Sequence, residues 1–437
     1  MKIFLIEDEK SLKPETLAKS DLAKFLAKLK KPNLNILKDV EEIINITKKD
    51  GDKALISFSN KFDKTAFKKS ADLLVTNKEI IDAEKSLNKE VKQALKLAYQ
   101  RIALYHKKQL PKDFLFTDNL GVELGNSWRA INSIGVYVPG GTASYPSSVL
   151  MSAIPAIIAG VKEISISAPS TAGKINPAVL FAAKICGIKN IYKIGGAQAI
   201  TAFTYGTNTV KKVDKIVGPG NAYVASAKKI LFGEVGIDMI AGPTDVTIIA
   251  DKNNNPNWIA ADALSQLEHG SDSKAFIITD NLEFAEKILI SISSLIKNLN
   301  RKNIIEKSLK NSAIFVIKNL NDAANIVNFI APEHLEISVK NPKKFLPKIQ
   351  NAGAIFLGNY TPEAIGDYIA GPSHTLPTEG TAKFSSGLSV FDFLKRISLI
   401  SCNKKSFLQL AQATSILAES EGLDAHKLSI TIRKNEI

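Results

Sequence analysis

Residues 131–159 read INSIGVYVPGGTASYPSSVLMSAIPAIIA and contain the pattern that decides the fold. Ile134–Val138 is a short run rich in β-forming residues, and it ends at a Pro-Gly-Gly turn. An apolar segment of helical length, Ser147–Ala159, follows the turn. A strand followed by a glycine turn and a helix is the unit from which parallel sheets are built.

The strand–helix alternation continues along most of the chain. Further short β-rich runs lie at 163–168, 191–194, 212–217, 246–250, 275–279, 313–317 and 354–357. Helical segments separate them, among them 177–186, 197–205, 222–232 and 257–269. Elements of these lengths form parallel βαβ units. We therefore predict an α/β protein with two parallel-sheet domains in series, each incompletely Rossmann-like, plus small helical segments at the N- and C-termini.

The flanking segments complete the predicted organisation. Periodic apolar positions predict helices at 22–29, 34–46 and 83–104, and residues 1–20 are interpreted as a polar N-terminal extension. A Gly/Ser-rich passage after Pro377 leads to two further helices, 390–396 and 408–421. The predicted units are 1–20, 21–130 together with 242–380, 131–241, and 381–437.

The composition fits a folded protein of a reducing compartment. Apolar residues make up 45% of the 437 residues, which disfavours disorder. The two cysteines, Cys186 and Cys402, have no disulfide, metal or redox spacing. The longest apolar stretch, Val149–Val161, is shorter than the about 18–20 residues that span a bilayer. We expect a cytoplasmic protein with no membrane association.

The net charge of +14 has two interpretations: attraction to an anionic partner, or a lysine-rich surface without one. The lysines are scattered, with no interleaved aromatic residues and no nucleic-acid-binding motif. We therefore favour the lysine-rich surface and expect no nucleic-acid partner.

The candidate chemistry centres on histidine, of which the chain has five. His106 lies in the basic stretch LYHKK and is interpreted as part of a solvated helix face. In NWIAADALSQLEHG (257–270), Gln266 and His269 are three residues apart near the C-terminus of a predicted helix. An imidazole and an amide oxygen at this spacing can hold a divalent metal with open positions. A surface histidine favoured by the helix dipole remains an alternative.

The other three histidines lie beside acidic residues or glycines. In APEHLE, a proline places Glu333 and His334 on a turn, where the pair can supply acid and base groups. Asp367 and His374 lie in the Gly/Pro-rich loop GDYIAGPSH, and His426 follows a terminal helix in EGLDAH. Each segment alone is also compatible with a solvated turn, a capping Asp or a frayed C-terminus. Their combination favours a metal-dependent enzyme.

Three glycine turns follow predicted strands. They are Pro139-Gly140-Gly141, Gly195-Gly196 and Gly218-Pro219-Gly220. In a parallel sheet such turns line one edge, where ligands bind, and the last one opens a helix whose N-terminus suits a phosphate. It matches only the start of GxGxxG, because Tyr223 stands where the third glycine belongs. The standard dinucleotide signature is absent, and ordinary loop chemistry explains the glycines equally well.

Taken in order, these segments resemble the histidinol dehydrogenase family. The likeness runs from about residue 131 to 426 and is most specific in GVYVPGG, GGAQAI, GPGNAYV, LSQLEHGSD, APEHLE, GDYIAGPSHTLPT, FSSGLSV and EGLDAH. The family carries out two successive NAD-dependent oxidations of L-histidinol, through L-histidinal, to L-histidine, the last step of histidine biosynthesis. The resemblance implies Zn²⁺ and NAD as cofactors and a homodimer whose sites are shared between subunits.

The resemblance also implies roles for single residues. The implied zinc ligands are Gln266, His269, Asp367 and His426, of which His426 serves the site of the other subunit. The implied acid–base pair is Glu333 and His334, and the implied NAD contacts are Tyr137, Gln198 and Asn221. The implied substrate contacts are Thr244, His374 and Glu421, together with His334 and the four zinc ligands. Residues 131–241 thus become the NAD-binding domain, 21–130 with 242–380 the metal and acid–base domain, and 381–437 the dimerisation segment.

The chain departs from the family pattern at a few positions. Residues 242–245 read Gly-Pro-Thr-Asp where the family usually has Gly-Pro-Ser-Glu, Glu379 stands where Gly is usual, and Lys383 where Arg is usual. Thr244 keeps the hydroxyl, whereas Asp245 is one methylene shorter. These changes put local loop geometry in doubt but remove no catalytic or metal position.

Three other functions remain open at this point. One is a zinc–NAD dehydrogenase of another small polyol, which Glu421 and His374 disfavour because an acidic, imidazole-lined pocket suits a cationic amino alcohol. Another is a zinc hydrolase in which Glu333 activates water on an amide or ester. The third is a basic binding protein with an inactive site.

Overall fold

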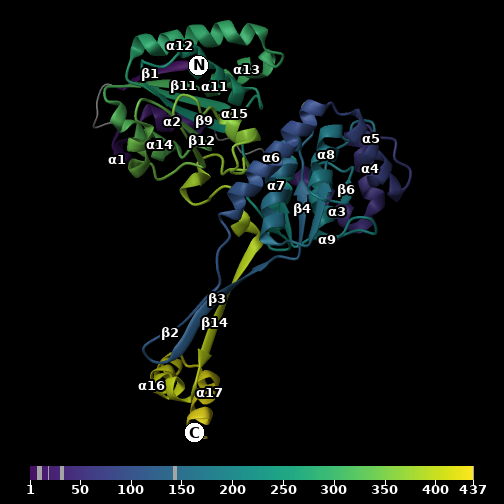
Figure 1. The fold of residues 1–437 in the computed structure, drawn as a ribbon, viewed down its shortest axis with the longest axis vertical. Helices are drawn as coiled ribbons and strands as arrows, with labels where there is room; N and C mark the ends of the chain where they lie inside the picture. Colours follow the sequence, from purple (N-terminus) through teal and green to yellow (C-terminus); the bar gives the residue numbers. More distant parts are fainter. Residues whose placement is uncertain (7–11, 18, 30–33, 141–144, 437) are drawn as a thin grey trace.

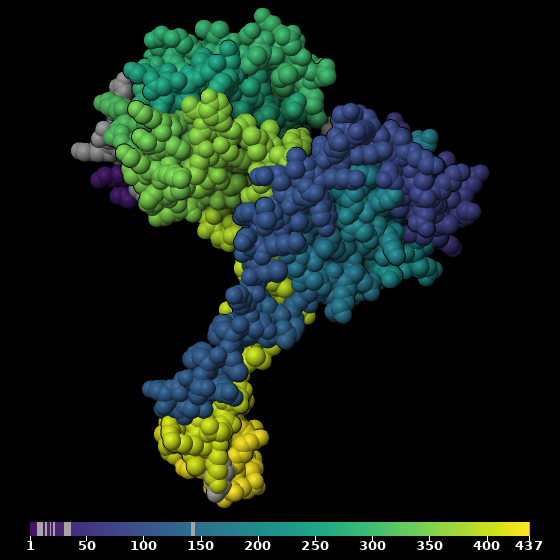
Figure 2. Space-filling view, in the orientation of Figure 1, coloured from purple at the N-terminus to yellow at the C-terminus, as the bar shows by residue number. Residues whose placement is uncertain are grey.

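The computed structural model describes residues 1–6, 12–17, 19–29, 34–140 and 145–436. Two α/β lobes lie side by side, and a narrow arm projects away from them (Figure 1, Figure 2). Among the described residues, one lobe contains a five-stranded parallel sheet, the other a six-stranded parallel sheet, and the arm a three-stranded antiparallel sheet. The predicted α/β class with two parallel sheets is confirmed.

The five-stranded sheet has the order β6-β5-β4-β7-β8. Its strands are β4 (Ser133–Tyr137), β5 (Glu163–Ser167), β6 (Asn190–Tyr192), β7 (Lys215–Val217) and β8 (Gly236–Ile237). The helices that alternate with them are α7 (Pro146–Ala159), α8 (Pro177–Ile185), α9 (Gly196–Tyr205) and α10 (Ala222–Leu231). The chain winds outward from β4 in both directions, so strand order reverses beside β4. Such a reversal is where open α/β sheets bind ligands.

Four earlier helices also cover this sheet. They are α3 (Leu34–Asp50), α4 (Asp52–Phe62), α5 (Asn77–Ser86) and α6 (Lys89–Lys107). Helix α3 packs on α9 and α10, whereas α5 packs on α8 and α6 on α7. The prediction that 21–130 joins 242–380 in one domain is therefore wrong for these helices, because periodicity predicts a helix but not the sheet it covers. The helix predicted at 83–104 is two helices, because Asn88 caps a new one.

The six-stranded sheet has the order β1-β11-β10-β9-β12-β13, and every pair is parallel. Its strands are β1 (Lys2–Ile6), β9 (Asp245–Ala250), β10 (Lys274–Thr279), β11 (Ala313–Ile317), β12 (His334–Ser338) and β13 (Ala354–Leu357). One face is covered by α11 (Pro256–Leu267), α12 (Leu282–Leu295) and α13 (Lys302–Ser308), the other by α1 (Pro14–Leu17), α2 (Asp21–Leu29) and α14 (Ala323–Ile330). The prediction of a separate extension at 1–20 is wrong, since β1 pairs with β11 along its whole length.

The arm combines two distant stretches of sequence. Strands β2 (Phe114–Thr117), β3 (Val122–Ala130) and β14 (Leu394–Cys402) form it in the order β14-β3-β2. Helices α16 (Lys404–Ser420) and α17 (Asp424–Asn435) pack on each other at its tip (Figure 1). The helix predicted at 390–396 is instead a short turn, η8 (Val390–Phe393), followed by β14. Nearly every residue of β14 is exposed, so no buried face gave the strand a hydrophobic period.

The remaining elements are short. They are α15 (Glu363–Tyr368) and the 3₁₀ turns η2 (Ser70–Leu73), η3 (Ile296–Asn298), η4 (Leu309–Asn311), η5 (Leu320–Asp322), η6 (Pro342–Lys348) and η7 (Thr381–Lys383). None of the helices in the described ranges combines the length and apolar character that a membrane span requires.

Candidate active site

Two adjoining cavities lie at edges of the parallel sheets, one at the carboxyl ends of the five-stranded sheet and one at the amino ends of the six-stranded sheet. The first, of about 680 Å³, borders the five-stranded sheet, and the second, of about 500 Å³, borders the six-stranded sheet. Pro139, Gly140 and Asn221 line both cavities, so the two share a wall. Both volumes lie in the range of small-molecule and cofactor sites.

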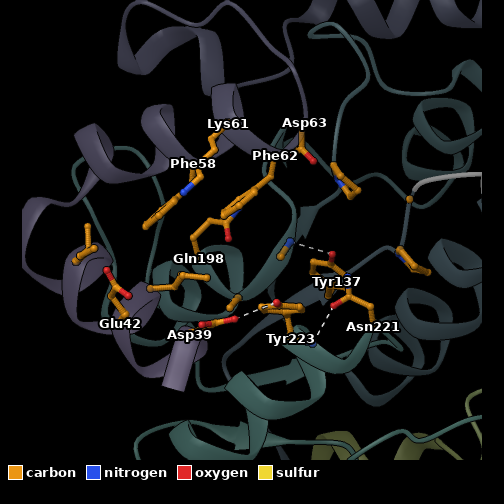
Figure 3. A pocket seen from close by; sticks show the side chains of 17 residues that line it. Asp39, Glu42, Phe58, Lys61, Phe62, Asp63, Tyr137, Gln198, Asn221 and Tyr223 are labelled. Atoms are coloured by element: carbon orange, nitrogen blue, oxygen red, sulfur yellow. Dashed lines mark hydrogen bonds between the residues drawn. The ribbon is translucent and has the colours of Figure 1, made fainter. Parts of the chain in front are cut away.

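The first cavity brings together the three residues predicted to contact NAD (Figure 3). Tyr137 ends β4, Gln198 lies in the first turn of α9, and Asn221 caps α10. The Tyr137 hydroxyl accepts the backbone N–H of Gly196 at 3.0 Å, and burial raises the pKa of Tyr137 to about 12. The strand ends therefore meet at one edge as the glycine turns predicted, although Gly141 lies outside the described residues.

The turn after β7 requires glycine at its first position, Gly218. This residue has a φ of +108°, and a Cβ there would lie 2.1 Å from the carbonyl oxygen of Tyr137. A buried ion pair fixes the turn from below: Lys228 Nζ donates to the Gly218 carbonyl oxygen and to Asp238 Oδ1, each at 2.6 Å. Asp238 Oδ2 in turn accepts the N–H of Gly218 at 2.7 Å. The pair thus holds both the N–H and the carbonyl of the residue that starts the turn.

The opposite wall of the first cavity comes from α3 and α4, and the sequence did not predict it. Phe58 and Phe62 of α4 line the cavity, and Asp39 of α3 accepts a hydrogen bond from the Tyr223 hydroxyl at 3.2 Å (Figure 3). Asp63 follows α4, where burial raises its pKa to about 6 and leaves Oδ2 without a partner. Local patterns could not place these residues, because a helix period does not reveal which sheet edge the helix covers.

The second cavity contains the predicted base, His334, which is 3% exposed at the start of β12. Its Nδ1 lies 3.2 Å from the carbonyl oxygen of Asp245. A carbonyl can only accept, so Nδ1 carries the hydrogen, and in the neutral ring Nε2 keeps a free lone pair. Nε2 is buried without a hydrogen-bond partner and lies 3.6 Å from Asp367 Oδ1. The residue therefore offers an oriented proton acceptor.

Buried carboxyl groups surround this imidazole. Burial raises the pKa of Glu333 to about 7, of Glu363 to about 8 and of Asp245 to about 6. Burial would lower the pKa of His334, but the carboxylates of Glu363, Glu333 and Asp367 outweigh it and raise that pKa well above its usual range. Strongly perturbed groups facing one cavity are typical of acid–base sites.

Thr244 and Asp245, two of the positions that depart from the family pattern, both contact this cluster. The Thr244 hydroxyl lines the second cavity and donates to the carboxylate of Glu333. Asp245 is 3% exposed, and its Oδ2 lies 3.3 Å from the backbone N–H of Glu333, which it accepts. The hydroxyl and the shorter acid thus both retain contact with Glu333.

The other two departures are Glu379 and Lys383. Glu379 has a φ of +54°, in the left-handed region that favours glycine, and its Oε1 lies 3.7 Å from Lys274 Nζ. Lys383 lies over the ring of Phe329, with Nζ 5.5 Å from the centroid. Neither residue lines the second cavity.

Three of the four predicted zinc ligands meet at this site. Gln266 is fully buried in the last turn of α11, His269 follows that helix, and Asp367 lies on α15. Each of His269, Glu363 and Asp367 places a donor atom within 4.8 Å of the others. Imidazole, carboxylate and amide oxygen form a suitable donor set for a divalent cation such as zinc. Glu363 was not predicted, although its position one turn before Asp367 in the sequence was a usable signal.

His374 belongs to the same cavity. Its Nδ1 lies 2.9 Å from the carbonyl oxygen of Asp367, and its Nε2 lies 3.4 Å from Ser148 Oγ of the other lobe. By contrast, Glu421 and His426 lie at the tip of the arm, away from the site of their own chain (Figure 1).

Several local predictions were wrong. Helix α11 ends at Leu267, so His269 lies in the turn beyond it, Asp367 lies in a short helix rather than a loop, and His334 begins a strand rather than a turn. His106 is only 1% exposed, with its Nδ1 2.7 Å from Gln109 Oε1. It shares one helix face with the buried residues 95, 98 and 102. This helical spacing predicts burial better than the basic residues beside His106 predict exposure.

The fold and the second cavity define the class: a two-lobed α/β enzyme with a buried histidine, His334, in a cavity lined by both lobes. Comparison with known proteins identifies the family. The family model described as histidinol dehydrogenase matches residues 27–434. The chain therefore belongs to the histidinol dehydrogenase family, oxidoreductases of the final step of histidine biosynthesis.

Individual relatives agree with this assignment. Histidinol dehydrogenase of Brucella suis biovar 1 (strain 1330) is 48% identical over 414 residues, covering 94% of this chain and 96% of the relative. The enzyme of Agrobacterium fabrum (strain C58) is also 48% identical over 414 residues, with the same coverage of both chains. A crystal structure of histidinol dehydrogenase from Elizabethkingia anophelis superposes with a TM-score of 0.92 at 37% identity, covering 100% of this chain and 98% of the other.

Proposed function

We propose that the protein is a zinc- and NAD-dependent L-histidinol dehydrogenase, which oxidises L-histidinol through L-histidinal to L-histidine. One observation carries the proposal: His334 Nε2 is a buried, unpartnered proton acceptor in a cavity that adjoins a cofactor-sized cavity in the other lobe. A dehydrogenase needs this arrangement, because the proton and the hydride leave the same alcohol for different acceptors.

The chain's own residues account for the proton transfers. His334 Nε2 accepts the hydroxyl proton of the alcohol, while the Asp245 carbonyl holds the ring in the required tautomer. The aldehyde then adds water, which Glu333 activates as a general base. His334 accepts a hydroxyl proton of the resulting hydrate in the second oxidation. Each oxidation thus releases one hydride, and water supplies the second oxygen of the product carboxylate.

The residues fit both cofactors. For zinc, the support is that His269, Glu363 and Asp367 place donor atoms within 4.8 Å of one another and that the Gln266 amide contacts Glu363. When bound, a divalent cation would hold the substrate and offset the carboxylates that raise the pKa of His334. For NAD, which accepts the hydride, the support is the cavity lined by Tyr137, Gln198 and Asn221.

We further propose a homodimer in which Glu421 and His426 complete the site of the partner subunit. The arm, which projects from the lobes (Figure 2), carries both residues away from their own site. It exposes apolar side chains, including Leu417, Leu428 and Ile400, the last of which is 74% exposed. Exposed apolar patches of this kind indicate an interface. We place the enzyme in the cytoplasm, which the free thiols of Cys186 and Cys402 support.

The activity is tested with purified protein, zinc, NAD and L-histidinol. We expect about two NADH per histidinol, one for each hydride removed. No NADH from any amino alcohol at verified zinc occupancy would refute the proposal.

Roles of single residues are tested by substitution. His334→Ala should lower kcat for both oxidations by about 10²–10⁴-fold while zinc stays bound, since the residue serves as the base. Loss of zinc from this variant would make His334 a ligand instead.

The shared site is tested by complementation. His426→Ala and His334→Ala subunits, each inactive as homodimers, should regain part of the activity when they exchange into heterodimers, because one site then has both residues intact. Failure to regain activity despite demonstrated subunit exchange would contradict a site shared between chains.

A further inference from the structure

Glu363 occupies a central place in the metal cluster, although none of the roles assigned above includes it. It is the first residue of α15 and only 2% exposed. Its backbone N–H donates to Glu336 Oε1 at 2.7 Å, which fixes the start of the helix. Asp367 follows four residues later on the same helix face, so α15 directs two carboxylates toward one point.

The Glu363 side chain contacts the amide of Gln266. In the amide orientation that matches donors with acceptors, Gln266 Nε2 donates to both carboxylate oxygens of Glu363, at 2.8 Å for Oε2. Gln266 Oε1 then faces the backbone N–H of Asp245 at 3.0 Å and the hydroxyl of Thr244. That hydroxyl has one hydrogen, which either Gln266 Oε1 or the carboxylate of Glu333 can accept; when Glu333 accepts it, Gln266 Oε1 keeps a lone pair.

This orientation matters because an amide binds a cation only through its oxygen. A side-chain amide that turns by half a rotation presents its NH₂ group to the ion and repels it. A carboxylate that accepts the NH₂ hydrogens prevents that rotation, just as carboxylates hold the ring N–H of histidine ligands in metal sites. The same carboxylate also adds negative charge beside the cation without occupying a coordination position.

We propose that Glu363 is a positioning residue of the metal centre, which holds the Gln266 amide so that its oxygen, and not its nitrogen, faces the ion. The inference rests on the proposed function, since it concerns the zinc of that site. It differs from direct ligation by Glu363, which the donor distances in the cluster also permit. The two roles predict opposite results for a neutral isostere at this position.

The test measures zinc affinity by competition with a chromophoric chelator, and the coordination geometry by the visible absorption of the Co²⁺-substituted protein. Glu363→Ala should weaken zinc binding by about 10–100-fold, the usual cost of losing a group that orients a ligand. Glu363→Gln retains an acceptor oxygen for the Gln266 NH₂ group. It should restore most of the affinity and leave the Co²⁺ spectrum unchanged.

Two further variants serve as controls. Glu268→Gln removes a charge next to His269 and leaves the backbone N–H of residue 268, which donates to the Gln266 carbonyl, in place. It should bind zinc within about two-fold of the wild type. His269→Ala removes a ligand and should both abolish tight binding and change the Co²⁺ spectrum. Thermal unfolding of each variant without metal shows whether the fold is intact.

The outcomes separate this inference from the proposed function. If the wild type binds zinc and Glu363→Ala binds it equally well, the positioning role is wrong and the zinc enzyme stands. If Glu363→Gln changes the Co²⁺ spectrum and loses affinity as His269→Ala does, Glu363 is a direct ligand. If Glu268→Gln and Glu363→Ala lose the same amount of zinc affinity, the loss reflects the removed negative charge and not the orientation of Gln266. If the wild type itself fails to bind zinc, the zinc dependence in the proposed function is wrong, and this inference is wrong with it.

Discussion

The ion pair beneath the glycine turn of the cofactor cavity gives a quantitative prediction. Lys228 and Asp238 have side chains that are 3% and 0% exposed, with Nζ and Oδ1 2.6 Å apart. Lys228→Met keeps the length of the side chain but removes the cation. Asp238 then remains buried with only the N–H groups of Gly218 and Met239 as partners, both at 2.7 Å.

The cost follows from the burial of the remaining charge. Removing one member of a buried pair destabilises a protein by about 3–5 kcal/mol, because the other charge stays desolvated. For a domain of about 150–250 residues, each kcal/mol corresponds to about 2–4 °C, so Tm should fall by about 6–20 °C. Affinity for NAD should also fall, since Lys228 holds the carbonyl of Gly218, three residues before Asn221.

The assay compares thermal unfolding of four proteins at neutral pH. Lys229→Met changes the neighbouring exposed lysine and should leave Tm within about 2 °C, as for most surface substitutions. The double variant Lys228→Met with Asp238→Asn removes both charges and should recover a large part of the loss. A fall below about 3 °C for Lys228→Met, or no recovery in the double variant, would show that the buried pair does not stabilise the turn.

Three further outcomes follow from single positions. Gly353→Ala should lower kcat, because a Cβ there would lie 2.6 Å from the backbone oxygen of Glu333 and would displace the acid–base pair; steady-state kinetics with unchanged zinc content tests this. The pKa of Asp63 is raised by burial to about 6, so the folded state binds more protons than the unfolded chain between pH about 4 and 6, and stability falls as pH rises through that window. Asp63→Asn should flatten this part of the Tm–pH curve, and an unaltered curve would contradict the raised pKa. Burial lowers the pKa of His106, so stability falls as pH drops below about 6.5, the ordinary pKa of the unfolded side chain, and His106→Gln should reduce that loss in the same measurement.

The sequence predicted what local patterns encode. The alternation of β-rich runs and helices predicted both parallel sheets, since central strands such as β9 and β10 are short β-rich runs buried along their whole length. The flanking motifs also gave the residues that meet at the second cavity, Glu333, His334 and Asp367 among them. Residues that begin neighbouring parallel strands must lie at one edge, so the motifs at the starts of β9 and β12 converge without further information.

Contacts between distant segments could not be predicted from local sequence patterns. Strand β1 pairs with β11, and α3 covers the sheet formed much later in the chain, but neither segment shows in its own residues which partner it has. The arm was missed for a different reason: β14 buries no face within one chain, so it has no alternating pattern to detect. Asp63 escaped notice because its importance lies in the cavity that α4 covers and not in its neighbours along the chain.

The division of the site between lobes sets what each substitution can change. The proposed proton acceptor and metal donors belong to the six-stranded lobe, while Tyr137, Gln198 and Asn221 belong to the five-stranded lobe, and the two cavities share only a wall. Gln198→Ala should therefore raise the KM for NAD and leave zinc affinity unchanged. Glu363→Ala should weaken zinc binding and leave the KM for NAD unchanged. The physical reason is that neither side chain reaches the cavity of the other lobe, so no direct contact couples them. Parallel measurement of NAD and zinc affinity on both variants tests this independence, and a variant that weakened both ligands equally would show that the lobes move as one coupled unit.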